Sequence, residues 1–416
     1  MCRSDPWDIR ASGGSDRHTW VMRALSADFT TFGLATDNYR RFPVSQSLRD
    51  RLQHLFIIGQ TGTGKSTLIE TLVTQDVAAG RGVMLIDPHG DLAASLHRSL
   101  KAPHHYWDPA DPSCRLGYNP LIPAGPAICP LITAGLIDAL KKQWADAWGA
   151  RMEHLLRYAI LALLEAPCPD IRDIMRLYIE KPFRAEVLAR VTDPQVLSFW
   201  QDEFRAMNYT NAVDGVAPIA NKLGAFLAHP LVRRAVCEPD KPLRLRRIMD
   251  RGETLIINLG KGRLGADNAK VLGGLILASA MHAGFSRQVL AQPQRSPFML
   301  YVDEFHSFTT EAFADLLSEI RKYGIAVTLA QQYLGQSEEA VFSAIMGNVG
   351  SLLAFRVGPL DTALLCRQLT EIAPRDLVYQ PNYRAIARLL VSGAPRVPFT
   401  LDTQAPRVGC VHKGAV

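Results

Sequence analysis

The stretch Leu55-Phe-Ile-Ile-Gly-Gln-Thr-Gly-Thr-Gly-Lys-Ser-Thr-Leu68 determines the fold of this chain. Residues 55–58 predict a short buried strand, and a helix is expected to begin at Ser66. Between them, residues 59–66 match the G-x-x-x-x-G-K-[ST] phosphate loop at every fixed position. The three glycines permit backbone angles that are closed to other residues, so that consecutive N–H groups can turn inward around a phosphate. The segment therefore predicts a nucleoside triphosphate site.

Each side chain of the loop has an expected role. Lys65 would bridge the β- and γ-phosphates, and the Ser66 hydroxyl would hold Mg²⁺, so ATP and Mg²⁺ are the expected cofactors. The alternative is a Gly/Thr-rich turn that matches by chance, but the strand before it and the helix after it favour the phosphate loop. The predicted nucleotide-binding residues are Gly59, Gln60, Thr61, Gly62, Thr63, Gly64, Lys65, Ser66 and Thr67.

Composition excludes several classes of protein. At 416 residues with 48% hydrophobic residues, the chain is long enough for a large α/β domain plus a second module, and it is not mainly disordered. The chain contains 46 Lys and Arg residues against 40 Asp and Glu residues. This small excess of positive charge permits a polyanionic partner without requiring one. The seven cysteines form no C-x-x-C pair, which is typical of free thiols in a reducing cytosol.

The sequence predicts no membrane segment. The longest apolar run, Val271 to Phe285, contains glycines and polar residues and is shorter than the roughly 20 residues of a membrane helix. Residues 2–10 are polar and lack the apolar core of a signal peptide. We therefore expect a cytoplasmic protein without an anchor of its own.

Strands and helices alternate outside the middle of the chain, which predicts a doubly wound, mainly parallel α/β sheet with the nucleotide at the carboxyl ends of the strands. Residues 1–54 are predicted to be a leader that packs on this domain and contains a strand at Thr31–Leu34. Residues 55–121 and 251–416 are predicted to be the ATPase domain, and the tail after Tyr379 shows strand-like runs but no motif. The expected strands are Leu55–Ile58, Val83–Asp87, His105–Trp107, Thr254–Leu259, Phe298–Val302, Ile325–Ala330 and Ser351–Val357.

Residues 122–250 are predicted to be an inserted all-α domain, with helical patterns over Leu136–Leu164, Gln195–Met207 and Val216–Val236. Its aromatic residues form i, i+4 pairs, which favours core packing over a ligand surface. A run of arginines near its end is either a solvated face or a contact for a phosphate backbone. The aromatic residues are Trp144, Trp148, His154 and Tyr158, and the arginines are Arg233, Arg234, Arg244, Arg246 and Arg247.

A second motif carries the catalytic chemistry. The apolar run Phe298–Val302 delivers Asp303 and Glu304, which is the Walker B pattern. Asp303 would hold Mg²⁺ through water, and Glu304 would orient and deprotonate the attacking water. Further on, Arg321 and Lys322 could simply offset a helix dipole, and Gln331-Gln332 could simply form a polar loop; composition alone favours these ordinary readings.

Several motifs in order resemble those of type IV secretion coupling proteins and conjugative DNA-transfer ATPases, which belong to the FtsK/HerA class of ring motors. The motifs, which fall between about Leu55 and Val357, are GQTGTGKSTL, LIDPHGDL, Asn119-Pro120-Leu121, LIINLGKGRLG, FMLYVDEFHSF and RKYGIAVTLAQQ. The resemblance implies a RecA-like P-loop NTPase fold, a homohexamer and a DNA substrate. It also implies that Arg321 reaches into the neighbouring subunit's site and that Gln332 senses the γ-phosphate, with Gln331 as the one-residue alternative.

The chain differs from this family at its N-terminus. Coupling proteins usually carry transmembrane helices before the phosphate loop, whereas residues 1–54 here are polar. We therefore expect any attachment to the inner membrane to be made through a partner protein. A relaxase and a secretion-channel protein are the candidate partners. The prediction is a ring ATPase that moves DNA through backbone contacts with little sequence preference. The alternatives are an ATP-driven motor for protein secretion or remodelling, and an ATP-gated platform that recruits a relaxase or effector.

Overall fold

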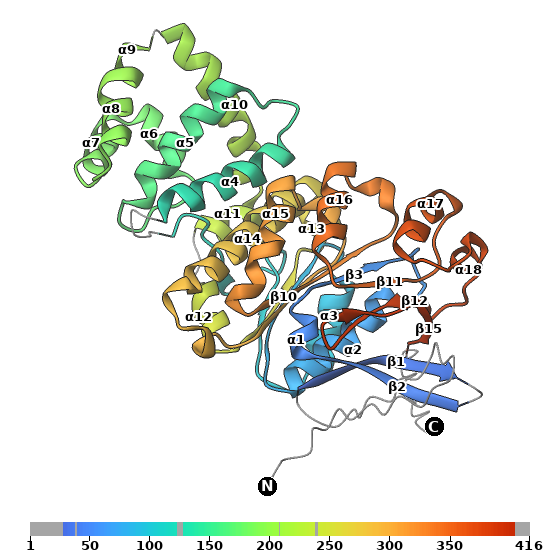
Figure 1. The fold of residues 1–416 in the computed structure, drawn as a ribbon. Helices are drawn as coiled ribbons and strands as arrows, with labels where there is room; N and C mark the ends of the chain where they lie inside the picture. Colours follow the sequence, from blue (N-terminus) through green and yellow to red (C-terminus); the bar gives the residue numbers. More distant parts are fainter. Residues whose placement is uncertain (1–27, 38–39, 123–127, 208, 238–239, 404–416) are drawn as a thin grey trace, which may run out of the picture.

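The computed structural model describes residues 28–37, 40–122, 128–207, 209–237 and 240–403 (Figure 1). Within these residues, one 11-stranded sheet has the order β2-β1-β15-β12-β11-β3-β10-β9-β4-β8-β5. Its strands are β1 (Phe29–Asp37), β2 (Arg40–Ser47), β3 (Leu55–Ile58), β4 (Gly82–Asp87), β5 (His105–Trp107), β8 (Thr254–Asn258), β9 (Phe298–Val302), β10 (Ile325–Gln331), β11 (Ser351–Ala354), β12 (Arg384–Arg388) and β15 (Phe399–Asp402).

The seven strands from β11 to β5 are parallel, whereas β12, β15, β1 and β2 continue the sheet in antiparallel pairs. The strand that precedes the phosphate loop, β3, lies between β10 and β11. Both faces of this strand are buried, which explains its continuous apolar sequence. The predicted doubly wound, mainly parallel fold is confirmed.

Two hydrophobic clusters cover the two faces of the sheet. Phe56 and Ile58 of β3 belong to one cluster, and Leu55 and Ile57 belong to the other, because successive strand residues point to opposite faces. The second face is covered by α2 (Lys65–Ala78) and α3 (Asp91–Ser99). The first face is covered by α12 (Leu245–Asp250), α14 (Ala266–Phe285), α15 (Glu311–Ile320) and α16 (Glu339–Asn348).

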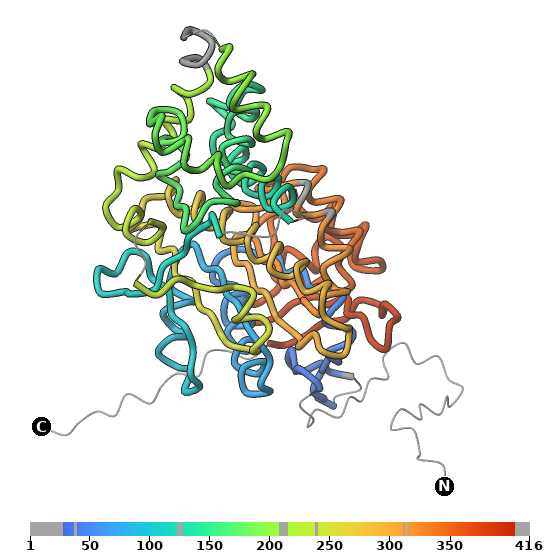
Figure 2. Tube along the Cα trace, turned by 90° about the vertical axis from the view of Figure 1, so that its left-hand side faces the viewer, coloured from blue at the N-terminus to red at the C-terminus, as the bar shows by residue number. Residues whose placement is uncertain are grey.

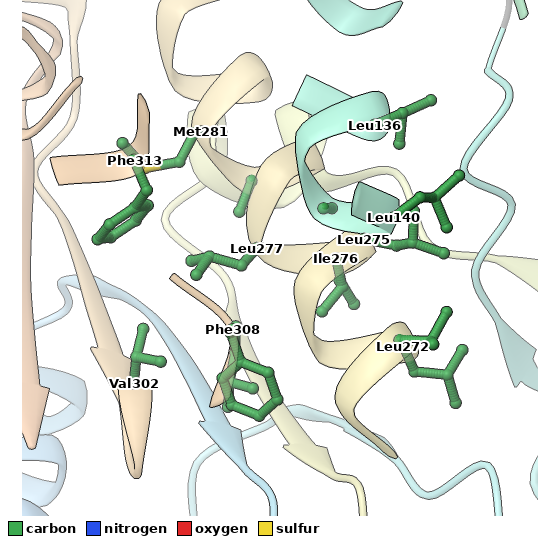
Figure 3. Close-up of a cluster of buried hydrophobic side chains, with 14 of the residues drawn as sticks. Leu136, Leu140, Leu272, Leu275, Ile276, Leu277, Met281, Val302, Phe308 and Phe313 are labelled. Carbon is green, nitrogen blue, oxygen red and sulfur yellow. The ribbon is translucent and has the colours of Figure 1, made fainter. Parts of the chain in front are cut away.

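Helix α14 is the apolar run noted in the sequence. Within the described residues, the stretch Ala266–Val289 is long and apolar enough to cross a membrane, but 67% of its most apolar window is buried inside the protein. Leu272, Ile276 and Met281 lie among side chains of α4 (Cys129–Gln143), β9 and α15 (Figure 3). Its Gly273 leaves room for the Phe308 ring, because a Cβ there would lie 2.1 Å from that ring. The apolar sequence is explained by a core helix.

Most of the helices between β6 and β7 project from one side of the molecule, as Figures 1 and 2 show. The short strands β6 (Leu116–Gly117) and β7 (Lys241–Pro242) pair at their base. These helices are α4, α5 (Ala150–Leu164), α6 (Asp173–Ile179), α7 (Lys181–Leu188), α8 (Pro194–Ser198), α9 (Phe204–Ala206), α10 (Tyr209–Ala228) and α11 (Pro230–Cys237). The last helix before β8, α12, packs instead on α14 and β4.

Some predicted helices are divided. The Leu136–Leu164 pattern is two helices, because the chain leaves the helix at Trp144 and starts a new one after Gly149. The Val216–Val236 pattern is also divided, because Pro230 begins a second helix. Residues 195–207 contain a π-helical turn at Phe199–Glu203. Periodicity identified the helical segments but not their breaks.

The aromatic residues of this helical region contact protein rather than an open surface. Trp144 is buried, and the Tyr158 ring stacks on Phe199 with 4.1 Å between centroids. Trp148 donates a hydrogen bond to Glu153. His154 is partly exposed and lies 2.7 Å from Glu203. The prediction of core packing is therefore confirmed for Trp144 and Tyr158.

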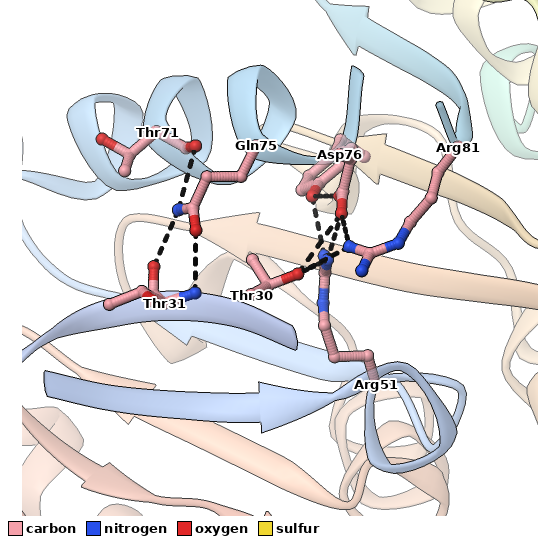
Figure 4. Close-up of polar contacts among 8 residues, drawn as sticks. Thr30, Thr31, Arg51, Thr71, Gln75, Asp76 and Arg81 are labelled. Carbon is pink, nitrogen blue, oxygen red and sulfur yellow. Dashed lines mark hydrogen bonds and ion pairs between the residues drawn. The ribbon is translucent and has the colours of Figure 1, made fainter. Parts of the chain in front are cut away.

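Residues 28–51 are more than a leader strand. β1 and β2 form an antiparallel pair, and a buried polar network joins this segment to α2 and β9 (Figure 4). Asp76 of α2 accepts hydrogen bonds from Arg51 at 2.5 Å and from Arg81 at 2.6 Å. Tyr301 of β9, two residues before Asp303, also donates to Asp76. The N-terminal segment is therefore fixed to both the phosphate-loop helix and the Walker B strand.

Two short helices and a hairpin complete the C-terminal part. They are α17 (Pro359–Gln368), α18 (Pro374–Val378), and the pair β13 (Leu390–Val391) and β14 (Ala394–Pro395). The remaining short helices are α1 (Leu48–Arg51) and α13 (Lys261–Leu264). The strand-like runs predicted after Tyr379 correspond to β12, β13 and β15, and they place the chain beside the phosphate loop.

Candidate nucleotide site

A cavity of about 250 Å³ lies at the carboxyl ends of the parallel strands. Its walls come from the phosphate loop, the ends of β4, β9 and β10, and the segment before β12. The cavity therefore brings together both sequence motifs, which are more than 200 residues apart in the chain. The lining residues are Thr61, Gly62, Gly64, Lys65, Ser66, Thr67, Asp87, His89, Asp91, Leu92, Asp303, Glu304, Gln332 and Tyr383.

The phosphate loop is held closely by the C-terminal strands. Gly64, which precedes α2, has a φ of 119°, and a Cβ on this residue would lie 3.0 Å from the Tyr383 ring. A Cβ on Gly59 would lie only 2.5 Å from the side chain of Phe355. The N–H of Gln60 donates to the carbonyl of Arg356 at 2.8 Å. Gly59 and Gly64 are thus required by close packing as well as by backbone angle.

Lys65 is buried beneath the loop. Its Nζ donates to the carbonyl oxygens of Gly59 at 2.5 Å and Gln60 at 3.2 Å. Burial lowers the pKa of Lys65, and the carboxylates of Asp303 and Glu304 act in the opposite direction. A cation in this position is suited to bind the oxygens of a polyphosphate.

The Walker B carboxylates are also buried. Burial raises the pKa of Asp303 to about 7, with Asp87 and Glu304 adding to the increase and Lys65 opposing it. Three buried carboxylates thus face one buried lysine, and this excess of negative charge fits a site that receives a divalent cation. The Ser66 hydroxyl and the Asp303 carboxylate are oxygen ligands of the kind Mg²⁺ prefers.

The metal would not be held by a dedicated protein cage. The described part of the chain contains no group of three or more His, Cys, Asp or Glu side chains arranged to hold a metal ion. Mg²⁺ usually keeps several waters and is bound by one or two protein ligands plus substrate phosphates. Ser66 and Asp303 are the residues that would hold it here.

Among the described residues, the Glu304 carboxylate is held by one hydrogen bond, from Gln332. Gln332 Nε2 donates to its Oε1 at 2.8 Å, and its Oε2 lies 3.5 Å from Nδ1 of His306. Its backbone is left-handed, with a φ of 46°, which is uncommon for a residue other than glycine and is found at functional sites. The carboxylate is therefore fixed at the cavity wall, as a general base would need to be.

The two glutamines at the end of β10, Gln331 within the strand and Gln332 after it, differ in position. Gln331 is fully buried and accepts a hydrogen bond from the Ser337 hydroxyl at 2.8 Å, away from Glu304. Gln332 lines the cavity and contacts Glu304 directly. Of the two glutamines, Gln332 therefore belongs to the cavity wall and Gln331 does not.

Arg321 lies away from this cavity. It is exposed, donates to the Gln53 side chain, and precedes β10, whereas the cavity is at the other end of β10. Seven residues of strand span about 23 Å. The structure therefore does not bring Arg321 together with the other predicted site residues within this chain.

The predicted site residues did not include several residues that lie in or beside the cavity, among them Asp87, His306 and Tyr383. Asp87 ends an apolar strand, which was a usable signal, and it accepts hydrogen bonds from the N–H groups of His89 and Ala93. His306 follows the Walker B pair, and burial lowers its pKa. Tyr383 had no local signal, because it reaches the loop through contacts with distant segments, namely the pairing of β12 and a hydrogen bond to Thr63.

Comparison with known proteins agrees with this geometry. Residues 38–122 match the family model DUF87, described as the central domain of helicase HerA. The plasmid coupling protein TrwB, in complex with the ATP analogue ADPNP, superposes with a TM-score of 0.63 over 94% of this chain and 97% of that chain, at 17% identity. The chain has the fold of the coupling ATPases.

Two further structures show the same likeness. TrwB in complex with ADP and Mg²⁺ gives a TM-score of 0.60 at 16% identity, covering 89% of each chain. VirB4 of Thermoanaerobacter pseudethanolicus gives 0.59 at 14% identity, covering 94% of this chain and 99% of that chain. A search of curated proteins gave no significant match. The predicted resemblance to conjugative coupling ATPases is thus confirmed for the fold.

Proposed function

We propose that this chain is an ATP-hydrolysing motor that translocates DNA and acts as a homohexameric ring. The observation that carries the proposal is the Glu304–Gln332 pair facing the phosphate loop across one cavity. The fold supports it, since it matches TrwB over nearly the whole of both chains, and TrwB structures contain ATP and GTP analogues or ADP with Mg²⁺.

Each group of the site would have a separate role in ATP hydrolysis. Bound Mg²⁺ would neutralise charge on the phosphates. Lys65 would hold the phosphate oxygens, and the N–H groups at the start of α2, from Gly64 to Thr67, would bind around them, since the N–H groups of Gly59 and Gln60 are paired with the carbonyls of Gln331 and Arg356. Glu304 would take a proton from the attacking water onto its carboxylate, while Gln332 holds that carboxylate in position.

We propose that Arg321 completes the site of a neighbouring subunit. Its separation from its own cavity, about the length of β10, excludes direct action within one subunit. A ring in which each subunit supplies this arginine to the next would place a positive charge where charge develops on the transferred phosphoryl group.

We also propose how the chain is divided into domains. Residues 55–121 with 251–416 would form the ATPase domain, residues 122–250 an inserted all-α domain, and residues 1–54 a segment packed on the ATPase domain. The DNA would be gripped through its phosphates with little sequence preference. The protein would work in the cytoplasm, and contact with a relaxase, a secretion channel or the inner membrane would be made through a partner.

The test is the ATPase rate of protein sized by light scattering, with and without single- and double-stranded DNA, at low salt. We expect a hexamer whose hydrolysis increases with DNA, and DNA binding that weakens steeply as salt increases. Hydrolysis without any effect of DNA would favour a protein substrate. A stable ATP-dependent complex without turnover would favour a recruitment platform.

A further inference from the structure

Tyr383 has an unusual backbone for its position. Among the described residues, six that are not glycine have a positive φ, and two of them, Glu304 and Tyr383, line the nucleotide cavity. Tyr383 has a φ of 62°. Strained backbone of this kind persists where surrounding structure holds it, and it clusters at functional sites. The left-handed backbone at Glu304 positions a carboxylate that the proposed chemistry uses, whereas the proposed chemistry uses no group of Tyr383.

Three hydrogen bonds hold Tyr383 in this conformation. Its N–H donates to the carbonyl of Thr63 in the phosphate loop at 2.7 Å. Its own carbonyl accepts from the N–H of Thr403 at 2.7 Å and from the Thr403 hydroxyl at 3.0 Å. The ring is half-buried and lies against Gly64, as the close approach to a Cβ built there shows. The backbone is thus fixed so that the aromatic ring lies beside the loop.

The sheet order places Tyr383 opposite the catalytic groups. Glu304 follows β9 and Gln332 follows β10, both on one side of β3, whereas Tyr383 precedes β12 on the other side. A nucleotide held by the loop with its γ-phosphate toward Glu304 has its nucleoside directed away from Glu304. The wall on that side includes Tyr383.

We propose that the Tyr383 ring forms the nucleoside subsite, against which the ribose and base of the bound triphosphate pack. This inference rests on the proposed function. The contact uses the face of the ring, so the phenolic hydroxyl is not required. Because every base has a π-face, stacking alone does not select adenine, and ATP and GTP should bind with similar affinity.

The test compares two ligands, ATP and inorganic tripolyphosphate, which carries three phosphates and no nucleoside. Dissociation constants would be measured by calorimetry for wild type, Tyr383→Phe, Tyr383→Leu and Tyr383→Gly. Tyr383→Gly removes the ring but suits the positive φ, so agreement between the Leu and Gly variants separates loss of the ring from backbone strain. Tyr379→Leu, at a side chain that is 83% exposed and outside the cavity, is the matched control.

We expect Tyr383→Leu and Tyr383→Gly to bind ATP roughly 5- to 150-fold more weakly while binding tripolyphosphate as wild type does. Tyr383→Phe and Tyr379→Leu should bind both ligands as wild type does. Equal losses for ATP and tripolyphosphate would show that Tyr383 only supports the loop and would overturn the inference, as would an unchanged ATP affinity. Both results leave the proposed function intact, whereas a wild-type protein that binds neither ligand would overturn both.

Discussion

Replacing Arg321 with alanine should abolish ATP hydrolysis and leave ATP binding intact. Within its own subunit the arginine is separated from the cavity by about 23 Å of strand, and its side chain contacts Gln53 at the surface. If that contact were its only role, the variant would lose at most about 1 kcal/mol of folding stability and keep its ATPase activity. An arginine that acts in a neighbouring site is worth roughly a thousandfold or more in kcat.

These two outcomes differ enough to be separated by a steady-state ATPase assay on assembled protein, with ATP affinity and thermal unfolding measured in parallel. The matched control is Lys322→Ala, because Lys322 is the next residue, is exposed, and pairs only locally with Glu319 at 2.6 Å. That variant should hydrolyse ATP at close to the wild-type rate. A wild-type rate in Arg321→Ala would refute the reasoning.

A mixing experiment tests whether Arg321 acts across the subunit interface. Lys65→Ala subunits lack a working site but still present Arg321, whereas Arg321→Ala subunits have a site and lack the arginine. Mixed rings should regain activity where a Lys65→Ala subunit presents its arginine to an Arg321→Ala site. Rings shown to be mixed but without activity would mean that Arg321 does not act in trans.

Three other substitutions have distinct expected outcomes. Lys65→Ala should abolish turnover and weaken ATP binding, and unchanged affinity would contradict the phosphate-loop assignment. Glu304→Gln should bind ATP and assemble but not hydrolyse; turnover at the wild-type rate would place the base elsewhere, with Asp87 the first candidate. Because burial raises the pKa of Asp303 to about 7, well above its value in an unfolded chain, the contribution of this carboxyl to the stability of the nucleotide-free protein should fall as the pH rises from about 4 to 7. Asp303→Asn should therefore raise Tm more at pH 8 than at pH 5, and equal increases would contradict the shift.

The sequence alone predicted those parts of the site that are formed by residues adjacent in the chain. The apolar runs 55–58 and 298–302 correspond to β3 and β9 with the same bounds, because strands buried on both faces need continuous apolar residues. Their ends carry the lysine and carboxylates, so the cavity followed from the rule that parallel strands meet at one edge. The resemblance to coupling ATPases pointed to Gln332, which lines the cavity; its role as a sensor of the γ-phosphate stays a prediction.

The remaining features depend on contacts between distant segments. Nothing near Tyr383 indicates a cavity wall, because its position is set by hydrogen bonds to Thr63 and Thr403. The buried network around Asp76 draws Arg51 and Arg81 from different segments, and each residue alone looks like an ordinary surface charge in the sequence. Helix breaks such as that at Trp144 were missed because the apolar period continues through them.

The most direct test of the central claim is displacement of a triplex-forming strand from duplex DNA. A ring that moves along DNA should release the third strand in the presence of ATP and Mg²⁺, and Glu304→Gln should bind the same DNA without releasing it. Release by wild type alone would support translocation. DNA-stimulated ATP hydrolysis by assembled wild-type protein without any release of the strand would contradict it.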